Sequence, residues 1–276
     1  MNPHAAHPTS PMALACGLWK NRNLIIQMTK RDVVGRYKGS IAGLGWSFFN
    51  PILMLAVYTF VFSVVFKARW GTGDEENKIE FAVVLFVGLI VHALFAEVLN
   101  RAPGLILSNV NYVKKVIFPL EILSIATLGA ALFHSFISLG VLLGAVALLQ
   151  GHLSWTVLLM PLVFLPLIFV TMGCAWLFAS LGVYLRDVGQ TIGILTTVML
   201  FLAPVFYPMS ALPEKYQVYL LINPLTFIIE QARQILIFGQ YPNWSGLAIY
   251  GLISLVVAWL GYWWFQKTRK GFADVL

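Results

Sequence analysis

The chain has 276 residues, of which 59% are hydrophobic and 11% charged, and its mean hydropathy is +0.83. Soluble domains carry about 25% charged residues, so this composition excludes a water-soluble globular protein and indicates an integral membrane protein. The net charge of +7 is placed at the edges of apolar runs, where it faces anionic lipid headgroups, so we expect no nucleic-acid partner. The two cysteines, Cys16 and Cys174, form no metal-binding or redox spacing.

The N-terminal segment divides into a tail and an interfacial helix. No Lys or Arg precedes the apolar stretch within residues 1–18, and that stretch is shorter than the core of a signal peptide. We therefore expect a mobile cytoplasmic tail there and not a signal peptide. Residues 19–38 combine apolar and basic side chains around a helical wheel. This pattern favours a helix that lies in the membrane interface and is anchored by Trp19 and Tyr37.

Six apolar runs approach or exceed the roughly 20 residues that a helix needs to cross a bilayer. Pro161 and Pro166 predict a kink or a late start in the fourth run, and Pro204 and Pro208 end the short fifth run. We therefore predict an all-α membrane protein with one transmembrane domain over residues 19–276. Its six transmembrane helices are expected at residues 41–66, 81–100, 120–149, 155–185, 191–207 and 246–265.

The positive-inside rule orients these spans. With the N-terminus in the cytoplasm, thirteen of the 18 Lys and Arg residues lie in cytoplasmic segments and the other five on the opposite side. The loop at residues 71–80, on that opposite side, is rich in acids, which contribute little to the rule. The count of basic residues predicts that both termini are cytoplasmic.

A cytoplasmic segment at residues 101–121 is longer than a simple connection between spans two and three needs to be. Prolines bracket it, and a Ser or Asn at position 108, 109 or 111 can cap a short helix inside it. The last turns of that helix carry Lys114 and Lys115. Two interpretations stand: a charged helix end that meets lipid headgroups, or a docking helix for a cytoplasmic partner.

The segment after the fifth span, residues 209–241, holds two helical pieces that are each too short to cross the membrane. Asn223 and Pro224 supply an N-cap and a first-turn proline for the second piece, which extends to about Phe238. Glu230 and Arg233 lie three positions apart on this helix and are expected to pair. An apolar segment of this kind predicts outer re-entrant helices packed against the bundle.

The sequence contains no phosphate-binding loop, zinc-protease motif or serine nucleophile elbow. We therefore expect that the chain hydrolyses no ATP and binds no metal. Glu97 and Arg101 lie four positions apart near the inner end of span two, which suits a structural ion pair or, alternatively, a proton relay. His92 and His134 are isolated in the sequence and fit packing histidines better than ligands.

Separated sequence motifs then resemble one known family. The first is RDVVGRYKGSIAGLGWSFFNP at residues 31–51. The others are APVFYPM at 203–209, LPE at 212–214 and INPLT at 222–226. Over residues 20–270 the chain is similar to the membrane subunits of type-2 ABC exporters, which export O-antigen, capsule and teichoic acid.

This resemblance implies the permease subunit of an ABC transporter, a homodimer in the inner membrane. Two copies of an ATP-binding cassette subunit would bind to it and hold ATP and Mg, while the chain itself binds no cofactor. The family's interfacial helix, six spans, cytoplasmic coupling helix and outer re-entrant helices match the elements expected above. The implied cargo is an O-antigen-like polysaccharide built on undecaprenyl diphosphate.

The resemblance also suggests two candidate sites. The lipid diphosphate would enter where two cations lie at the junction of the interfacial helix and the first span. The candidate substrate-path residues are Arg36, Tyr37, Lys38, Trp46, Phe49 and Tyr58. The candidate ATPase-coupling residues are Asn109, Tyr112, Lys114 and Lys115. Arg36 and Lys38 fit equally well as ordinary positive-inside anchors.

Three other functions remain open at this point. A secondary carrier is opposed by the sparse buried charge and by the absence of two similar halves. A membrane-bound glycosyl-lipid enzyme is opposed by the absence of an acid-rich loop that would hold a metal. An ABC exporter of a small drug or lipid keeps the same fold and changes only the cargo. An ATPase subunit that co-purifies with the chain would support either ABC function over the carrier.

Overall fold

The computed structural model describes residues 9–66, 78–114 and 118–276, and every regular element in these ranges is a helix. Five helical segments in the described residues are long and apolar enough to cross a membrane. They are Gly43–Phe62, Phe81–Gly104, Glu121–Leu149, Trp155–Tyr184 and Trp244–Val275. The prediction of an all-α, multi-pass membrane protein is confirmed.

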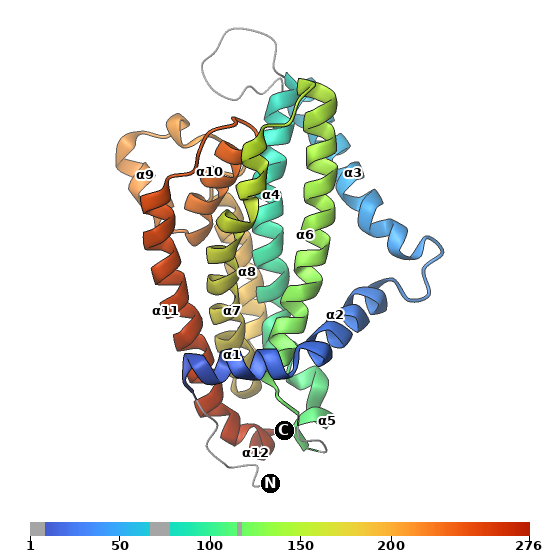
Figure 1. Cartoon of the computed structure of the whole chain (residues 1–276), viewed down its shortest axis with the longest axis vertical. Coiled ribbons are helices and arrows are strands. Elements are labelled where there is room, and N and C mark those ends of the chain that lie inside the picture. Colours follow the sequence, from blue (N-terminus) through green and yellow to red (C-terminus); the bar gives the residue numbers. More distant parts are fainter. Residues whose placement is uncertain (1–8, 67–77, 115–117) are drawn as a thin grey trace.

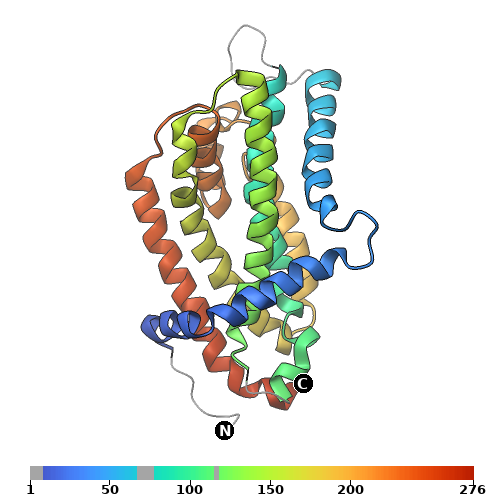
Figure 2. The ribbon, with the colours of Figure 1, turned by 45° about the vertical axis from the view of Figure 1, so that its right-hand side comes forward.

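The bundle is organised around α4 (Lys78–Arg101), which contacts α6 (Glu121–Gln150), α7 (Met160–Tyr184), α8 (Val188–Phe201) and α10 (Pro224–Leu236) (Figure 1). Within the chain, 83% of the apolar window of α4 is buried, compared with 11% for the first span. That span contains α3 (Trp46–Tyr58), which stands at the edge of the bundle beside α6 (Figure 2). Helix α11 (Trp244–Thr268) packs along α7.

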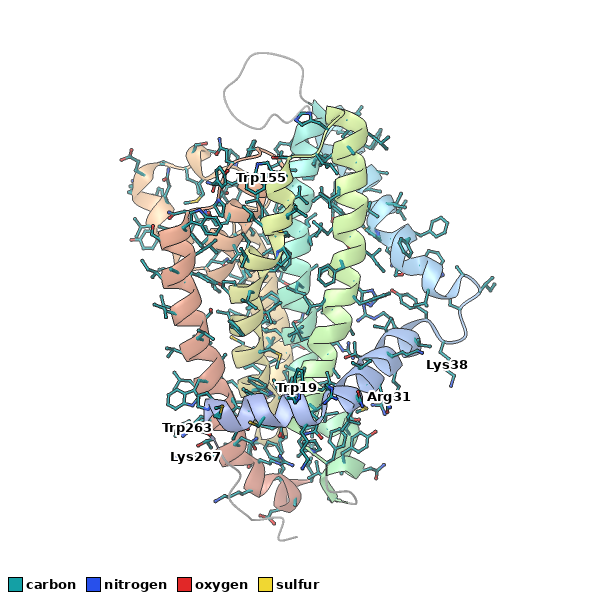
Figure 3. All side chains as sticks on the ribbon, viewed as in Figure 1. Trp19, Arg31, Lys38, Trp155, Trp263 and Lys267 are labelled. Carbon is teal, nitrogen blue, oxygen red and sulfur yellow. The ribbon has the colours of Figure 1, made fainter. Side chains whose placement is uncertain are left out.

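The two ends of the bundle carry different elements. Helices α1 (Pro11–Lys20) and α2 (Arg22–Tyr37) cross one end, which also holds α5 (Val110–Lys114) and α12 (Phe272–Val275); we name it the basal end (Figure 1). The opposite, distal end holds α9 (Glu214–Leu221) and α10. Trp19 and Trp263 lie at the basal end and Trp155 at the distal end (Figure 3). Tryptophans at both ends are typical of helices that span a bilayer.

The N-terminal helix begins earlier than the sequence predicted. The Ser10 hydroxyl accepts a hydrogen bond of 3.2 Å from the backbone N–H of Ala13, and Pro11 occupies the first turn. Helix α1 therefore starts at Pro11, inside the segment expected to be a mobile tail, and not at Trp19. After a break at Asn21, α2 continues to Tyr37. Residues 1–8 of the expected tail lie outside the described residues.

Most predicted spans agree with the observed helices to within a few residues. The first consists of a 3₁₀ turn (Gly43–Gly45), α3 and a π-helix (Thr59–Val65). The fourth opens with a 3₁₀ turn (Trp155–Leu159), and α7 starts only at Met160, with proline in its first turn. The predicted late start is therefore confirmed. The acidic loop at residues 71–80 lies largely outside the described residues.

The fifth predicted span is the exception, because α8 ends at Phe201 and not at Tyr207. Its 14 residues correspond to about 21 Å, which is less than the ~30 Å hydrocarbon core of a bilayer. Pro204 lacks an N–H and blocks the carbonyl four residues before it, so the helix cannot continue. Other groups satisfy the freed carbonyls: Asn223 Nδ2 donates to Met199 O and Tyr207 Oη donates to Phe201 O, both at 2.9 Å.

The distal helix α10 starts where the sequence predicted, because Asn223 Oδ1 accepts the backbone N–H of Leu225 at 3.0 Å and Pro224 follows the cap. The predicted ion pair between Arg233 and Glu230 is confirmed at 3.0 Å. Only 1% of the Arg233 side chain is exposed, and this burial lowers its pKa to about 10. Its guanidinium stays charged at neutral pH and donates to the carbonyls of Val84 and Val205, each at 3.1 Å. Arg233 thus ties α10 to α4 and to the turn after α8.

Glycines allow α7 and α11 to cross closely. A Cβ atom added at Gly173 on α7 would lie less than 3.0 Å from backbone atoms of Val257 and Ala258 on α11. A Cβ added at Gly261 on α11 would meet the backbone of Gly173 in the same way. Because backbone atoms lie opposite, no side-chain rotation can relieve these contacts. The α7–α11 crossing therefore depends on both glycines.

Candidate functional site

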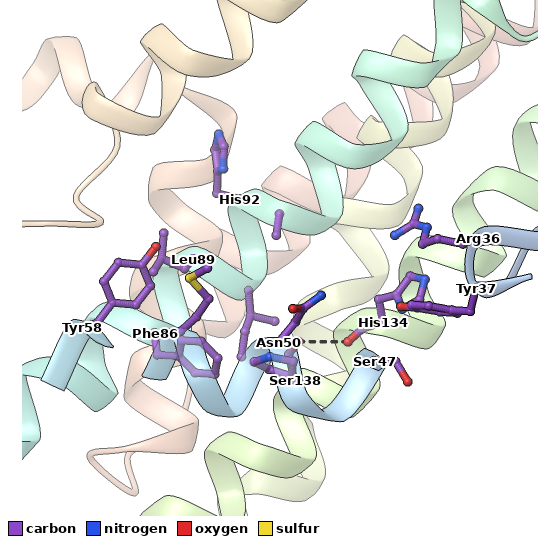
Figure 4. A pocket seen from close by; sticks show the side chains of 14 residues that line it. Arg36, Tyr37, Ser47, Asn50, Tyr58, Phe86, Leu89, His92, His134 and Ser138 are labelled. Atoms are coloured by element: carbon purple, nitrogen blue, oxygen red, sulfur yellow. Dashed lines mark hydrogen bonds between the residues drawn. The ribbon is translucent and has the colours of Figure 1, made fainter. Parts of the chain in front are cut away.

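A cavity of about 310 Å³ lies between α2, α3, α4 and α6. In Figure 4, Arg36, Tyr37 and His134 group at one end of the cavity, and Tyr58 and Phe86 lie at the other. The polar end and the apolar walls suit an amphiphilic ligand rather than a wholly apolar one. The lining residues are Arg36, Tyr37, Ser47, Asn50, Pro51, Met54, Tyr58, Phe86, Leu89, Ile90, His92, Ala93, His134 and Ser138.

Four charged side chains meet beside this cavity, two from α2 and two from α4. Arg36 donates from Nη2 to Oε1 of Glu97. Arg101 donates from Nη2 to both carboxylate oxygens of Asp32, at 2.6 and 2.7 Å. The pair that the sequence predicted, Glu97 with Arg101, is present at 3.8 Å and is the longer contact. Two cations and two anions therefore hold the end of α2 against α4 as a neutral group.

Tyr37 and His134 form the next contact along the cavity. Tyr37 Oη lies 3.4 Å from His134 Nδ1, and the two rings meet edge to face with centroids 5.8 Å apart. Burial raises the pKa of the Tyr37 phenol, and Arg36 offsets part of this effect, so the phenol keeps its proton at neutral pH. Tyr37 is therefore partly buried against His134, and its role as a membrane-interface anchor stays a prediction.

The six predicted substrate-path residues divide into two groups. Arg36, Tyr37 and Tyr58 line the cavity. Lys38 is exposed and its side chain points away from the bundle (Figure 3). Trp46 and Phe49 are also exposed, at 44% and 63%, on a face of α3 that does not line the cavity. The structure therefore does not bring these three residues to the same site as Arg36.

His92 and His134 differ in their hydrogen bonding, and His92 behaves as the sequence predicted. Its Nε2 lies 2.9 Å from the backbone carbonyl of Thr196 on α8, which satisfies one ring nitrogen. His134 differs because its Nε2 is buried without a hydrogen-bond partner among the described residues. Sequence reasoning missed Asp32 and the approach of His134 to Tyr37, because both contacts join helices that are far apart in the chain. No cluster of His, Cys, Asp or Glu that fits a metal ion occurs in the described ranges.

The predicted coupling segment forms a 3₁₀ turn (Leu107–Asn109) followed by α5. Asn109 Nδ2 donates to the backbone carbonyl of Leu105 at 2.9 Å, which supports the turn. The Tyr112 ring stacks on Phe118 with centroids 4.5 Å apart, and its hydroxyl accepts a hydrogen bond of 2.8 Å from Arg31 on α2. Lys114 is exposed at the end of α5, whereas Lys115 lies outside the described residues.

The C-terminal segment braces the same basal region. Arg269 donates to the carboxylate of Glu121 at 2.8 Å and to the backbone carbonyl of Phe118 at 2.7 Å. Phe272 on α12 is fully buried against Phe265 and Tyr184. The basal surface around α5 is therefore held by contacts from both ends of the chain.

The apolar spans and the helices that cross the basal end define a multi-pass membrane protein. The chain belongs to the ABC-2 type transporter family, whose model matches residues 23–237. Membrane subunits of this family lack an ATPase domain and pair with a separate ATP-binding subunit, so the chain is not an enzyme. The secondary carrier and the glycosyl-lipid enzyme left open by the sequence are thereby excluded.

Polysaccharide exporters are among the most similar characterised proteins. The chain is 27% identical over 260 residues to the O-antigen export system permease protein RfbA of Myxococcus xanthus, covering 93% of this chain and 96% of that protein. It is 23% identical over 236 residues to the polysialic acid transport protein KpsM of Escherichia coli, covering 84% and 88%. A capsule polysaccharide export inner-membrane protein, CtrC of Neisseria meningitidis, is 24% identical over 254 residues, covering 91% and 92%.

Proposed function

We propose that this chain is the permease subunit of an ABC transporter that exports an O-antigen-like polysaccharide, linked to undecaprenyl diphosphate, across the inner membrane. The observation that carries the proposal is the cavity between α2, α3, α4 and α6, with the Arg36 guanidinium at its polar end and apolar walls beyond. A guanidinium suits the paired oxygens of a diphosphate, and apolar walls suit a polyprenyl chain or the C–H faces of a sugar. The names of the relatives point to the same class of cargo.

The proposed transporter has six spans, one more than the five long helices described above. We count α8 as the fifth crossing of a six-span bundle. Ala203 and Val205, in the non-helical segment that follows it, are fully buried in the chain, so their backbone is shielded from lipid. Helices α9 and α10 are then re-entrant elements on the outer side, and the basal end with both termini is cytoplasmic. Two copies of the chain would enclose the export path, and each would bind one ATP-binding subunit that holds ATP and Mg.

Orientation is testable by cysteine labelling in a background that carries Cys16→Ser and Cys174→Ser. A cysteine at exposed Ser210, at the distal end, should react with a membrane-impermeant maleimide in cells whose inner membrane is accessible but intact. A cysteine at exposed Ser108, at the basal end, should react only after the membrane is permeabilised. The reverse pattern would place the basal end outside and contradict the proposed direction of export.

The experiment that tests the proposed function is recovery of the ATP-binding subunit with the tagged chain from native membranes. Wild type should retain this subunit and show ATPase activity that rises when undecaprenyl-diphosphate-linked glycan is added. Lys114→Glu reverses a charge on the exposed end of α5 and should lower recovery of the subunit about fivefold, with a marked dependence on salt.

The matched control is Lys215→Glu, which makes the same charge change on exposed α9 at the distal end. It should leave recovery of the ATP-binding subunit unchanged. Equal losses from both variants would show that net charge, and not docking at α5, controls assembly. Stimulation of ATPase activity by a small drug but not by lipid-linked glycan would favour the alternative cargo.

A further inference from the structure

The cation proposed to meet the lipid diphosphate is already occupied within the chain. Arg36 on α2 is paired with Glu97 on α4, in a contact that joins positions 61 residues apart. The Arg36 side chain is 38% exposed and that of Glu97 21%, so the pair is reachable from the cavity that Arg36 lines. A ligand that binds Arg36 through its phosphate must therefore compete with the Glu97 carboxylate.

The neighbouring cation gives Glu97 a second partner. Arg101 Nη1 lies 3.8 Å from the same carboxylate oxygen, Oε1, that Arg36 contacts. Arg101 stays bound to Asp32 through its other terminal nitrogen, Nη2, at 2.6 and 2.7 Å. If Arg36 turns toward a ligand, Glu97 keeps a cation beside it. The exchange therefore leaves no unpaired carboxylate in the partly buried site, which would be the costly outcome.

The charge of the competing ligand decides whether it can displace a carboxylate. Phosphatidylglycerol carries one net negative charge and is far more abundant in the bilayer than any polyprenyl-linked glycan, which carries two negative charges on its diphosphate. Zwitterionic phospholipids carry no net charge. An unpaired arginine at this position would be occupied by phospholipid most of the time. An arginine paired with a carboxylate is released only by a ligand that offers more charge and more acceptor oxygens than the carboxylate does.

Resting on the proposed function, we propose that Glu97 is a specificity-determining residue. Its carboxylate pairs with Arg36 and so keeps phospholipid headgroups of one net negative charge from binding there, whereas a lipid-borne diphosphate displaces it. Glu97 acts through Arg36 and needs no contact with the glycan. By competing for Arg36, Glu97 determines which phospholipid headgroups can bind in the cavity. Arg36 determines the affinity for the diphosphate.

The test measures binding of radiolabelled undecaprenyl diphosphate to the full-length chain in nanodiscs of phosphatidylcholine, which has no net charge, with and without the anionic lipid phosphatidylglycerol. In wild type, phosphatidylglycerol should change the apparent Kd by less than about twofold. In Glu97→Gln, the diphosphate should bind about fivefold more tightly without phosphatidylglycerol, and adding phosphatidylglycerol should remove that gain. Inorganic diphosphate at the same concentrations should compete weakly, because it lacks the polyprenyl chain.

Glu121→Gln is the matched control, since it breaks a different arginine–glutamate pair, with Arg269, away from the cavity. It should bind like wild type under both lipid conditions. Glu97→Asp keeps the charge on a shorter stem and should show an intermediate response, which serves if Glu97→Gln does not fold.

The two levels of the proposal fail differently. If Arg36→Gln binds undecaprenyl diphosphate as tightly as wild type, the proposed binding site itself is contradicted. Loss of binding in Arg36→Gln, together with wild-type affinity and wild-type insensitivity to phosphatidylglycerol in Glu97→Gln, would keep the site and overturn the role of Glu97.

Discussion

Arg36→Gln should lower surface polysaccharide at least about tenfold while the chain accumulates in the membrane at the wild-type level. The expected loss follows from removing charge-assisted hydrogen bonds to a diphosphate, which contribute about 1.5–3 kcal/mol. Arg36→Lys should also lower export, because an ammonium cannot reproduce the planar, two-pronged contact of a guanidinium. Surface polysaccharide, normalised to the amount of chain in the membrane, is the quantity to measure.

Lys38→Gln provides the matched control for this prediction. It removes the same charge two residues along, but the Lys38 side chain is exposed and points away from the bundle (Figure 3). If the cations act only as positive-inside anchors, the two substitutions should have equal effects. Wild-type export in both Arg36→Gln and Arg36→Lys would leave Arg36 as a membrane anchor and remove it from the substrate path.

The second large effect is expected at the crossing of α7 and α11. Gly261→Ala places a Cβ less than 3.0 Å from backbone atoms of Gly173, so the two helices must move apart. We expect a loss of about 3 kcal/mol in the free energy of unfolding, or roughly 6–12 °C in the melting temperature of the purified chain. Gly173→Ala should have a similar effect, because its new Cβ meets the backbone of Val257.

Gly144→Ala, on α6, is the control for the same change in an apolar helix. No atom lies within 4 Å of the position where its Cβ would stand. Its melting temperature should stay within about 2 °C of wild type, because the substitution only improves helix propensity. Equal melting temperatures for Gly144→Ala and Gly261→Ala would contradict the close crossing.

Hydropathy alone predicted most of the helices because a spanning helix must satisfy its backbone internally over a fixed length. The end of α8 was misplaced because the apolar run continues through Phe206, although Pro204 had already stopped the helix. The start of α1 was missed because Ser10 and Pro11, which begin it, stand in a segment without a long apolar core. Both boundaries follow from local residues that are visible in the sequence. Pro204 ends α8, and the cap formed by Ser10 and Pro11 begins α1.

The candidate site was predicted only in part. Arg36 and Tyr37 were found because charge and aromatic residues gather at the end of the interfacial helix, and both line the cavity. The direction in which Trp46 and Phe49 point could not be predicted, since every face of an apolar helix looks alike in sequence. The ion pairs of Arg101 with Asp32 and of Arg36 with Glu97 form because α2 crosses α4 at this point. The spacing of residues along one sequence does not predict that crossing.

The most direct measurement follows the lipid-linked glycan in a strain that lacks this chain. Export by the proposed route predicts that surface polysaccharide disappears and that undecaprenyl-diphosphate-linked glycan accumulates on the cytoplasmic leaflet, where lectin reaches it only after permeabilisation. Expression of the wild-type chain should restore the surface polysaccharide, and Arg36→Gln should not. Undiminished surface polysaccharide in the strain without the chain, or lipid-linked glycan that still reaches the outer leaflet, would contradict the proposed function.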